Sequence, residues 1–128
     1  MRDDRRALGS EGEKRAARFL ARRGYRIVAR NVRAGGVELD LVAAKRDLLV
    51  FVEVKTRRSE RYGSAAAGLG AAQRRRLLRG AHAYLVRQTE RPARIRFDVI
   101  ACTLEARARW RVRHWPGAFD ASEEWGFD

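Results

Sequence analysis

Hydrophobic and polar residues follow two different periods along the chain, and together they predict two helices and five strands. Apolar residues recur every three to four positions in the two helical segments. In the strand segments they alternate or run continuously and are rich in Val, Ile and Phe. The expected elements are the helix Leu8–Arg23, the strands Tyr25–Asn31, Val37–Ala44 and Leu49–Arg57, the helix Ala71–Gln88, and the strands Ile95–Thr103 and Arg109–Trp115. This αβββαββ order predicts an α/β fold, a three-layer sandwich around a mixed β-sheet.

Local signals place the ends of the helices. Ser10 followed by Glu13 forms a capping-box pattern, which is typical of the start of a helix. Gly24 is a natural helix end, and Pro92 cannot continue the second helix. The stretch Thr56–Gly70 holds several arginines and glycines, which predicts an exposed basic loop before the second helix.

The two strands in the middle of the sequence place acidic residues on one face of a predicted hairpin. Glu38 and Asp40 share a face of the first strand, and Glu53 and Lys55 share a face of the second. A four-residue loop, Lys45–Leu48, would make Asp40 face Glu53 and Glu38 face Lys55, with the Cβ atoms of each pair about 5 Å apart. The same register pairs Ala44 with Leu49 and Val42 with Phe51. The opposite face of the first strand is apolar and holds Val37, Leu39 and Leu41.

Three carboxylates that converge in apolar surroundings favour a bound cation. Like charges facing each other destabilise strand pairing, and an unpaired buried charge costs several kcal/mol or more. Mg²⁺, or Mn²⁺ in its place, would relieve this cost because such ions take carboxylate oxygens. The ion could then polarise a phosphate and activate a water, while Lys55 orients the water or neutralises developing charge. The bare pattern also fits a solvated acidic corner in which Glu38 and Lys55 form a surface ion pair.

The overall charge predicts a polyanionic partner. The chain has 29 Lys and Arg against 16 Asp and Glu, a net charge of +13. Such a balance favours nucleic acid first and an anionic membrane surface second. Contacts to phosphates would fix position without reading sequence. The expected DNA contacts are basic residues of the loop and the second helix, namely Arg57, Arg58, Arg61, Arg74, Arg75 and Arg79.

The 128 residues suffice for one domain, followed by a tail of different composition. We expect a single domain over residues 1–115 and an acidic, aromatic tail over Pro116–Asp128. The tail carries a charge of −4. Since the whole chain carries +13, residues 1–115 carry +17. Such a tail either lies on the basic surface as a nucleic-acid mimic or stays mobile.

The compartment is expected to be the cytoplasm. Cys102 is the single cysteine, so no internal disulfide can form, and His82 and His114 lack a zinc-ligand spacing with it. The N-terminus leads into no apolar signal core. The longest run of large apolar residues, Leu48–Val52, is far too short for a membrane span, so no membrane partner is expected.

The acidic hairpin also carries a family resemblance. The run Gly36–Val42 followed by Leu49–Arg57 resembles the YraN family of small bacterial proteins. Those proteins are similar to the PD-(D/E)XK nuclease superfamily and to archaeal Holliday-junction resolvases. The resemblance extends from about Gly9 to Val99. Its further matches are Gly12-Glu13, Gly24-Tyr25, Arg30-Asn31, Tyr62-Gly63 and Arg96-Phe97-Asp98.

The resemblance implies a restriction-endonuclease-like fold and a role for each site residue. Asp40 and Glu53 would bind the metal, and Lys55 would be the water-orienting base. Glu13 would be an additional catalytic acid from the first helix, although the capping box with Ser10 explains it equally well. Glu38 is a candidate supporting acid or a partner in a salt bridge at the rim of the site.

Two departures from the family pattern concern the neighbours of these residues. Val37 stands between the glycine and the acid that usually follows it directly, while Glu38 and Asp40 keep their spacing. The family often has a lysine at the start of the second helix, where this chain has Gln73 followed by three arginines. An arginine at this place could keep a phosphate contact, but it would not reproduce a role specific to that lysine.

Three functions compete. The first is a Mg²⁺-dependent endodeoxyribonuclease acting on branched DNA or on recombination and repair intermediates, for which a homodimer is compatible with paired cuts. The second is a non-catalytic nucleic-acid-binding adaptor that retains the nuclease fold. The third is docking of the basic second helix on acidic lipid or on a partner protein. The acidic cluster favours the first, because a pure binder gains nothing from carboxylates beside a phosphate.

Overall fold

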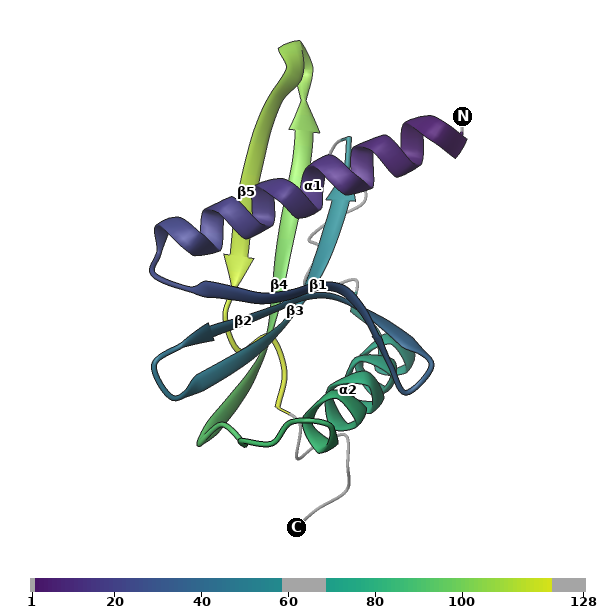
Figure 1. Cartoon of the computed structure of the whole chain (residues 1–128). Coiled ribbons are helices and arrows are strands. Elements are labelled where there is room, and N and C mark those ends of the chain that lie inside the picture. The colour runs from purple at the N-terminus through teal and green to yellow at the C-terminus, as the bar shows by residue number, and fades with distance from the viewer. Residues whose placement is uncertain (1, 59–68, 121–128) are drawn as a thin grey trace.

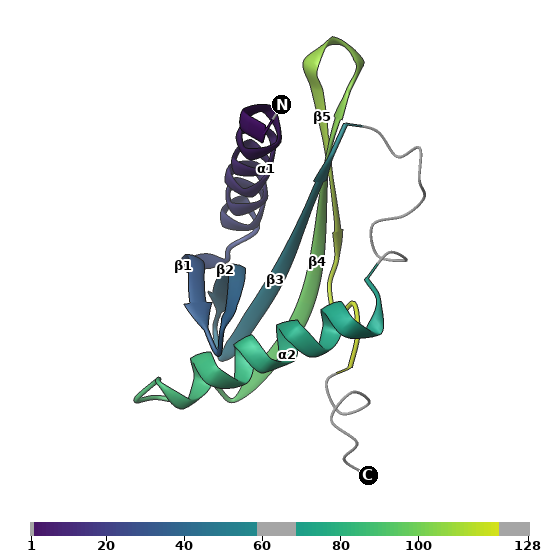
Figure 2. The same ribbon diagram turned by 90° about the vertical axis from the view of Figure 1, so that its right-hand side faces the viewer.

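The computed structural model describes residues 2–58 and 69–120. Within these ranges a five-stranded sheet lies between two helices, one on each face (Figures 1 and 2). A short 3-10 turn, Ala106–Ala108, joins the last two strands. The elements in chain order are α1 (Arg2–Arg22), β1 (Arg26–Ala34), β2 (Val37–Lys45), β3 (Leu48–Arg57), α2 (Ala71–Val86), β4 (Arg94–Glu105) and β5 (Arg109–Trp115). The αβββαββ order and the three-layer α/β architecture predicted from the sequence are confirmed.

The sheet is mixed, and its spatial order β1-β2-β3-β4-β5 follows the chain. β3 and β4 run parallel, which requires a crossover, and α2 lies in that crossover. The other neighbours are antiparallel. β1 and β5 are therefore the two edges of the sheet.

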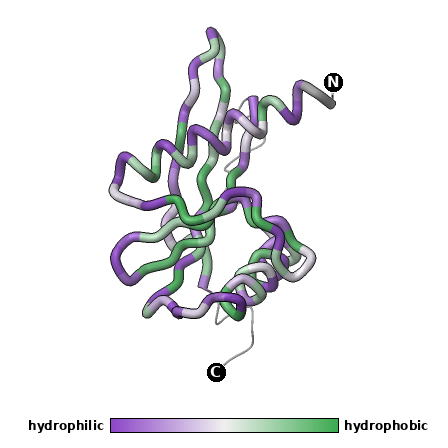
Figure 3. The backbone as a smooth tube through the Cα atoms, in the orientation of Figure 1, coloured by the Kyte–Doolittle hydropathy of each residue, from purple (hydrophilic) through white to green (hydrophobic). Residues whose placement is uncertain are grey.

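The two faces of the sheet bury separate cores. The α1 face packs Ala16, Ala17 and Leu20 against the sheet. On the α2 face Phe51 is fully buried and stacks on Phe97, with 5.7 Å between the ring centroids. Figure 3 shows the green apolar segments gathered along the central strands. β3 is buried over its first five residues and half-buried from Glu53 onward, so the candidate site begins where β3 leaves the core.

Helix α1 begins earlier than the sequence predicted. It starts at Arg2, so Ser10 and Glu13 lie inside the helix and the capping box is wrong. The reason is that the residues before Ser10 are mostly good helix formers and include no proline. An explanation of Glu13 as a capping residue therefore falls away.

The β2–β3 turn is tighter than predicted. Lys45 pairs with Leu48, so the loop is the two residues Arg46 and Asp47 rather than four. Arg46 takes a left-handed backbone with φ of 57°, which such a two-residue turn requires. The predicted pairs of Ala44 with Leu49 and Val42 with Phe51 are confirmed.

The ladder between β2 and β3 stops at Leu41 and Val52. The predicted pairs of Asp40 with Glu53 and Glu38 with Lys55 are therefore wrong as ladder pairs. Beyond this point β2 pairs with β1 and, within residues 2–58 and 69–120, with no other strand. The β1–β2 hairpin curves away from β3 here (Figure 1).

A distortion in both strands of the β1–β2 hairpin accompanies this separation. Asn31 and Asp40 occupy a missing rung between the pairs Arg30–Leu41 and Val32–Leu39, and Asn31 has a φ of 47°. On the two sides of this rung the apolar residues change faces. Leu39 belongs to the α2-side core and Leu41 to the α1-side core. The expectation that they share one face is wrong, because strict alternation fails where a residue leaves the ladder.

The Arg96-Phe97-Asp98 motif forms a buried polar network. Asp98 is fully buried and accepts hydrogen bonds from Arg96, with its two closest contacts at 2.7 and 2.8 Å. His114 Nε2 lies 2.7 Å from the same carboxylate, and the Gly117 N–H donates to it at 3.0 Å. Burial alone would raise the pKa of Asp98, but these hydrogen bonds lower it overall. The motif thus ties β4 to β5 and to the segment after β5.

The first residues of the expected tail lie against the sheet. The Ala118 N–H donates to the Phe97 carbonyl oxygen at 2.8 Å, and the Phe119 ring stacks on Phe97 with 5.0 Å between centroids. Residues 121–128, which carry most of the predicted acidic tail, lie outside the described residues.

Candidate active site

Asp40 lies on β2 at the point where β2 and β3 separate. Its Oδ2 accepts a hydrogen bond from the backbone N–H of Val54 at 2.9 Å. Burial, followed by the negative charge of Glu38, raises the pKa of Asp40, while the Val54 hydrogen bond opposes that rise. The side chain is therefore fixed against β3 in surroundings that disfavour its charge.

Glu53 follows the fully buried run of β3 and shares these surroundings. Burial and the charge of Asp40 raise its pKa to about 7, against the opposing effect of the cations Lys55 and Arg76. A carboxyl group with such a pKa is only partly ionised at neutral pH. Asp40 and Glu53 thus act on each other electrostatically although they are not ladder partners.

Glu13 reaches the same region from α1. Gly12, the residue before it, packs so closely on Thr56 of β3 that a side chain at position 12 would clash there. Burial and then the charge of Asp40 raise the pKa of Glu13, and a hydrogen bond from the Asn31 side chain lowers it. Within the described residues, the buried Oε2 of Glu13 has no hydrogen-bond partner.

Lys55 stands on the same face of β3 as Glu53. Its Nζ lies 3.4 Å from Oε1 of Gln73 in the first turn of α2. Gln73 thus contacts the candidate water-orienting residue from the helix start at which the YraN pattern often has a lysine. Arg76, three residues further along α2, acts on Glu53 from the same side.

A cavity of about 250 Å³ opens in front of Asp40 and Glu53 on the α2 side. Glu38 stands at its edge, with a half-exposed side chain 4.0 Å from Arg33. Since a water molecule occupies about 30 Å³ of liquid, this space holds several waters. Its lining residues are Val37, Glu38, Asp40, Glu53, Gln73, Arg76 and Leu77.

The donor set suits a hard divalent cation held by few protein ligands. In the described part of the chain, no three His, Cys, Asp or Glu side chains are gathered so as to surround a metal ion together. Mg²⁺ commonly keeps several waters and takes one or two carboxylates. Asp40 and Glu53 could supply two such carboxylates. Among the described residues, Oε2 of Glu13 has no hydrogen-bond partner.

The arginines expected to contact DNA fall in different places. Arg57 ends β3 and Arg58 follows it in an exposed position, while Arg61 lies outside the described residues. Arg75 and Arg79 are exposed on α2. Arg74 is half-buried and donates to the Leu69 carbonyl oxygen at 3.0 Å, so it also holds the chain before α2.

Three residues near the carboxylates were not predicted as site residues: Asn31, Gln73 and Arg76. The sequence contains a signal for two of them, because Gln73 and Arg76 are three positions apart and so share one face of a helix. Asn31 is harder to find. Asparagine is enriched in left-handed backbone, but nothing local shows that a strand is interrupted there.

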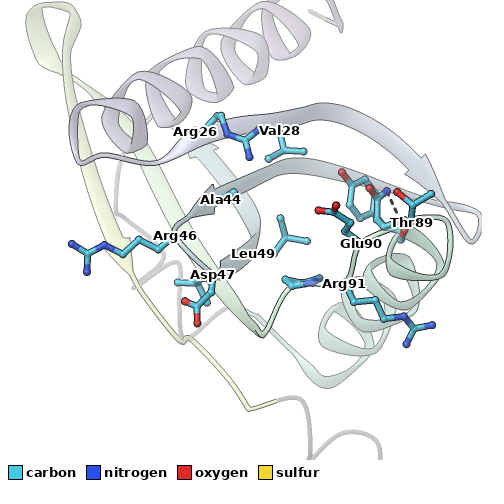
Figure 4. Close-up of a pocket in the computed structure, with 13 residues that line it drawn as sticks. Arg26, Val28, Ala44, Arg46, Asp47, Leu49, Thr89, Glu90 and Arg91 are labelled. Carbon is cyan, nitrogen blue, oxygen red and sulfur yellow. Dashed lines mark hydrogen bonds between the residues drawn. The ribbon is translucent and has the colours of Figure 1, made fainter.

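A separate hollow of about 410 Å³ lies at the other end of the β2–β3 hairpin. Leu49 and Ala44 form part of its floor, and Figure 4 shows Arg46 and Arg91 extending outward from it. Arg26 of β1 stands on another side, and Asp47 and Glu90 offset part of the positive charge. None of the candidate catalytic residues lines this hollow, so it is distinct from the carboxylate site.

Comparison with known proteins identifies the family. A family model described as "Uncharacterised protein family UPF0102" matches residues 12–102, a range that includes Glu13, Asp40, Glu53 and Lys55. The chain belongs to the UPF0102 family. This agrees with the YraN resemblance seen in the sequence.

UPF0102 proteins from several bacteria are similar over most of the chain. One from Symbiobacterium thermophilum is 47% identical over 116 residues, which cover 91% of this chain and 98% of the relative. One from Nitratidesulfovibrio vulgaris is 41% identical over 126 residues, covering 98% of this chain and 93% of the relative. One from Burkholderia pseudomallei is 52% identical over 98 residues, covering 76% and 67%. As for membranes, neither described helix combines the length and the apolar character that a span requires.

Proposed function

We propose that this UPF0102 protein is a divalent-metal-dependent endonuclease that hydrolyses phosphodiester bonds in DNA. The observation that carries the proposal is the coupled pair Asp40 and Glu53, with the pKa of Glu53 raised to about 7. An acidic pair in partly buried surroundings needs a function or a cation to offset its cost. The spacing of Asp40, Glu53 and Lys55 also resembles the PD-(D/E)XK nuclease pattern.

Each residue has a defined task in this proposal. Asp40 and Glu53 hold Mg²⁺, or Mn²⁺ in its place, which when bound neutralises phosphate charge and makes a water more acidic. The Lys55 ammonium donates hydrogen bonds that orient the attacking water or stabilise the charge that develops on the phosphate. Glu13 offers its partnerless oxygen as an acceptor to a water on the α1 side.

Gln73 and Arg76 supply the polar contacts on the α2 side. Gln73 restrains Lys55 by the 3.4 Å contact to its Nζ, which limits where the ammonium can point. Arg76 lines the cavity and is exposed, so it can contact a phosphate oxygen of the substrate. These contacts position the substrate backbone and carry no base preference.

The alternative is a non-catalytic nucleic-acid-binding adaptor. Glutamine in the place of the usual lysine supports it, as does the net charge of +13, which favours binding with or without cleavage. The acidic group weighs against it, because carboxylates beside a phosphate path weaken binding unless a cation lies between them.

Cleavage assays separate the two proposals. Labelled four-way junctions, flaps, single strands and duplexes are incubated with Mg²⁺ or Mn²⁺, using wild type, Asp40→Asn and the control Asp47→Asn. Asp47→Asn is the same chemical change, made at an exposed residue of the β2–β3 turn. Metal-dependent cutting by wild type and Asp47→Asn, absent in Asp40→Asn, supports the nuclease and reveals its substrate. Tight binding without cutting on every substrate supports the adaptor.

The proposal includes a homodimer for substrates that need two cuts. A four-way junction is resolved by paired incisions, and one chain offers a single carboxylate pair of this kind among its described residues. Sedimentation of the protein alone and with a junction tests this part separately. A monomer in both conditions removes the dimer and leaves the hydrolysis proposal standing.

A further inference from the structure

The β4–β5 hairpin continues past the rest of the sheet. Arg57, the last residue of β3, pairs with Thr103, and β4 then runs on to Glu105, where β5 is its one partner among the described strands. The hairpin tip is Ala106–Ala108, where Arg107 and Ala108 both have a left-handed backbone, with φ of 61° and 58°. Figures 1 and 2 show this hairpin as a projection beyond the body of the protein.

The two faces of β5 differ in chemistry. Trp110 and Val112 pack toward α1, and the Arg15 guanidinium lies 4.9 Å from the centre of the Trp110 ring. The alternate residues therefore point to the opposite face. They are three exposed arginines, Arg109, Arg111 and Arg113, and the half-buried Trp115 at the end of the strand. The Arg113 guanidinium lies 5.3 Å from the centre of the Trp115 ring.

The strand register connects these arginines to the candidate active site. Lys55 of β3 pairs with Ala101 of β4, and Ala101 pairs with Arg113 of β5. Paired residues on neighbouring strands share a face, so Arg113 lies on the face of Lys55 about 10 Å away, two strand spacings across. The next row along the same face contains Arg57 and Arg111.

We propose that Arg57, Arg109, Arg111 and Arg113 form a nucleic-acid contact surface, here termed the arginine row. It holds the phosphate backbone of a strand that runs from the carboxylates toward the hairpin tip. The claim that this strand leads into the active site rests on the proposed function. The claim that the arginine row binds nucleic acid does not.

The spacing of the row sets the length of strand that it contacts. Alternate residues of a strand are about 6.7 Å apart, so Arg113 to Arg109 spans about 13 Å. A nucleic-acid strand in a duplex advances about 3.4 Å per nucleotide. The row therefore follows about four nucleotides. The exposed ion pair between Arg111 and Glu105, at 3.1 Å, restrains Arg111 without removing it from solvent.

The chemistry of this face favours nucleic acid over a membrane surface. A segment that binds at the lipid interface needs an apolar face to insert beside its basic residues. Here Trp110 and Val112 of β5 face α1. Trp115 lies on the arginine face, but it packs against the buried residues Val99 and Ala101. No large apolar side chain of β5 is exposed, so the arginine row offers charge without an apolar group to insert into lipid, as a phosphate-tracking surface does.

The test compares two triple variants of the full chain that lose the same charge. One replaces Arg109, Arg111 and Arg113 by Gln. The control replaces the arginines that line the separate hollow (Figure 4), namely Arg26, Arg46 and Arg91. Binding of a labelled 24-nucleotide single strand and of a matching duplex is followed by fluorescence anisotropy in EDTA over a series of salt concentrations.

We expect the arginine-row variant to bind at least about ten-fold more weakly at low salt, with the control close to wild type. Each lost phosphate contact lowers the slope of log K against log salt by about 0.7 to 0.9, so three contacts lower it by about 2 to 3. Equal losses of affinity in both variants would show that only the net charge matters, and this would overturn the proposal. Unchanged binding by the arginine-row variant would overturn it as well.

Two further arms keep the result decisive. If circular dichroism shows that the triple variant is misfolded, the single variant Arg109→Gln is used instead. Its slope of log K against log salt is expected to change by about 1. An unchanged slope would count against the arginine row. Vesicles containing phosphatidylserine test the membrane. Loss of vesicle binding with retained oligonucleotide binding would overturn the assignment to nucleic acid. Because binding is measured in EDTA, a failure of the hydrolysis proposal leaves this outcome readable.

Discussion

The carboxylate of Asp40 accepts a hydrogen bond from the backbone N–H of Val54, with 2.9 Å between Oδ2 and N. This bond takes the place of the next ladder rung after Leu41 and Val52. One side chain thus satisfies a backbone donor of β3 and stands beside Glu53. Where the β2–β3 ladder ends, the two strands are thus still joined, through the side chain of Asp40.

Replacing Asp40 should separate its structural role from its charge. Asp40→Asn keeps an oxygen acceptor for Val54, and it removes a charge that burial disfavours, so we expect a higher free energy of unfolding at pH 8 without metal. Asp40→Ala leaves the Val54 N–H unpaired and should be about 1–3 kcal/mol less stable than Asp40→Asn. Urea denaturation in EDTA measures both. Equal stability of the two variants would show that the hydrogen bond contributes nothing.

Glu53 should make stability depend on pH near neutrality. Its pKa is about 7 in the folded protein against a model value of 4.5, so between these values the folded state binds more protons than the unfolded state. The free energy of unfolding then falls as the pH rises through this window. For Glu53 alone the fall is on the order of 3 kcal/mol.

Glu53→Gln provides the matched comparison, because it keeps the shape and removes the titration. The difference in unfolding free energy between this variant and wild type, measured by urea denaturation in EDTA, should grow from pH 4.5 to pH 7. A difference that stays constant over that range would contradict the raised pKa. Mg²⁺ favours the charged carboxylate, so we expect it to reduce the difference.

The elements of the fold were predictable because their signals are local. Alternation and apolar runs gave β2 and β3 within one residue at each end, and the pairs of Val42 with Phe51 and Ala44 with Leu49 are confirmed. Pro92 and the glycines around the loops bounded the helices well enough to give the element order. The parallel pair β3–β4 then follows from a helix between two strands.

The geometry around the acidic group was not predictable from periodicity. A pattern of period two assumes that every residue stays in the ladder, whereas Asn31 and Asp40 leave it together. Pairing of Asp40 with Glu53 was wrong for this reason, even though both carboxylates do reach one cavity. The approach of Glu13 depends on how α1 crosses β3, a tertiary contact that no local signal encodes.

Asn31 should act as a positioning residue through Glu13 and through the backbone. Asn31→Gly keeps the left-handed conformation and removes the amide, whereas Asn31→Ala also disfavours a φ of 47°. We expect Asn31→Ala to be about 1–2 kcal/mol less stable than Asn31→Gly. In both variants Glu13 loses the hydrogen bond that lowers its pKa.

The functional effect of Asn31 can be measured apart from stability. Isothermal titration with Mn²⁺ should show weaker binding for both variants, with the loss in Asn31→Gly largest at low pH, where Glu13 is more readily protonated. Wild-type affinity in Asn31→Gly across the pH range would limit Asn31 to a backbone role.

The last prediction concerns the contact between α1 and β3 that brings Glu13 to the site. A side chain at Gly12 would overlap with Thr56, whereas a Cβ at Gly9, one turn earlier in the same helix, meets nothing within 4 Å. Gly9→Ala should therefore stabilise the protein by about 0.5–1 kcal/mol, as alanine does in a helix. Gly12→Ala should destabilise it by about 1–3 kcal/mol despite the same change in helix propensity.

Thr56→Ala tests whether the clash is the cause. Combined with Gly12→Ala it removes the overlapping Oγ1 and Cγ2 atoms, so the double variant should recover much of the stability lost by Gly12→Ala alone. Thermal and urea denaturation of the four variants forms a double-mutant cycle with a favourable coupling between positions 12 and 56. Independent effects at the two positions would mean that α1 yields freely at this crossing, and the close packing would then not explain how Glu13 is held beside Asp40.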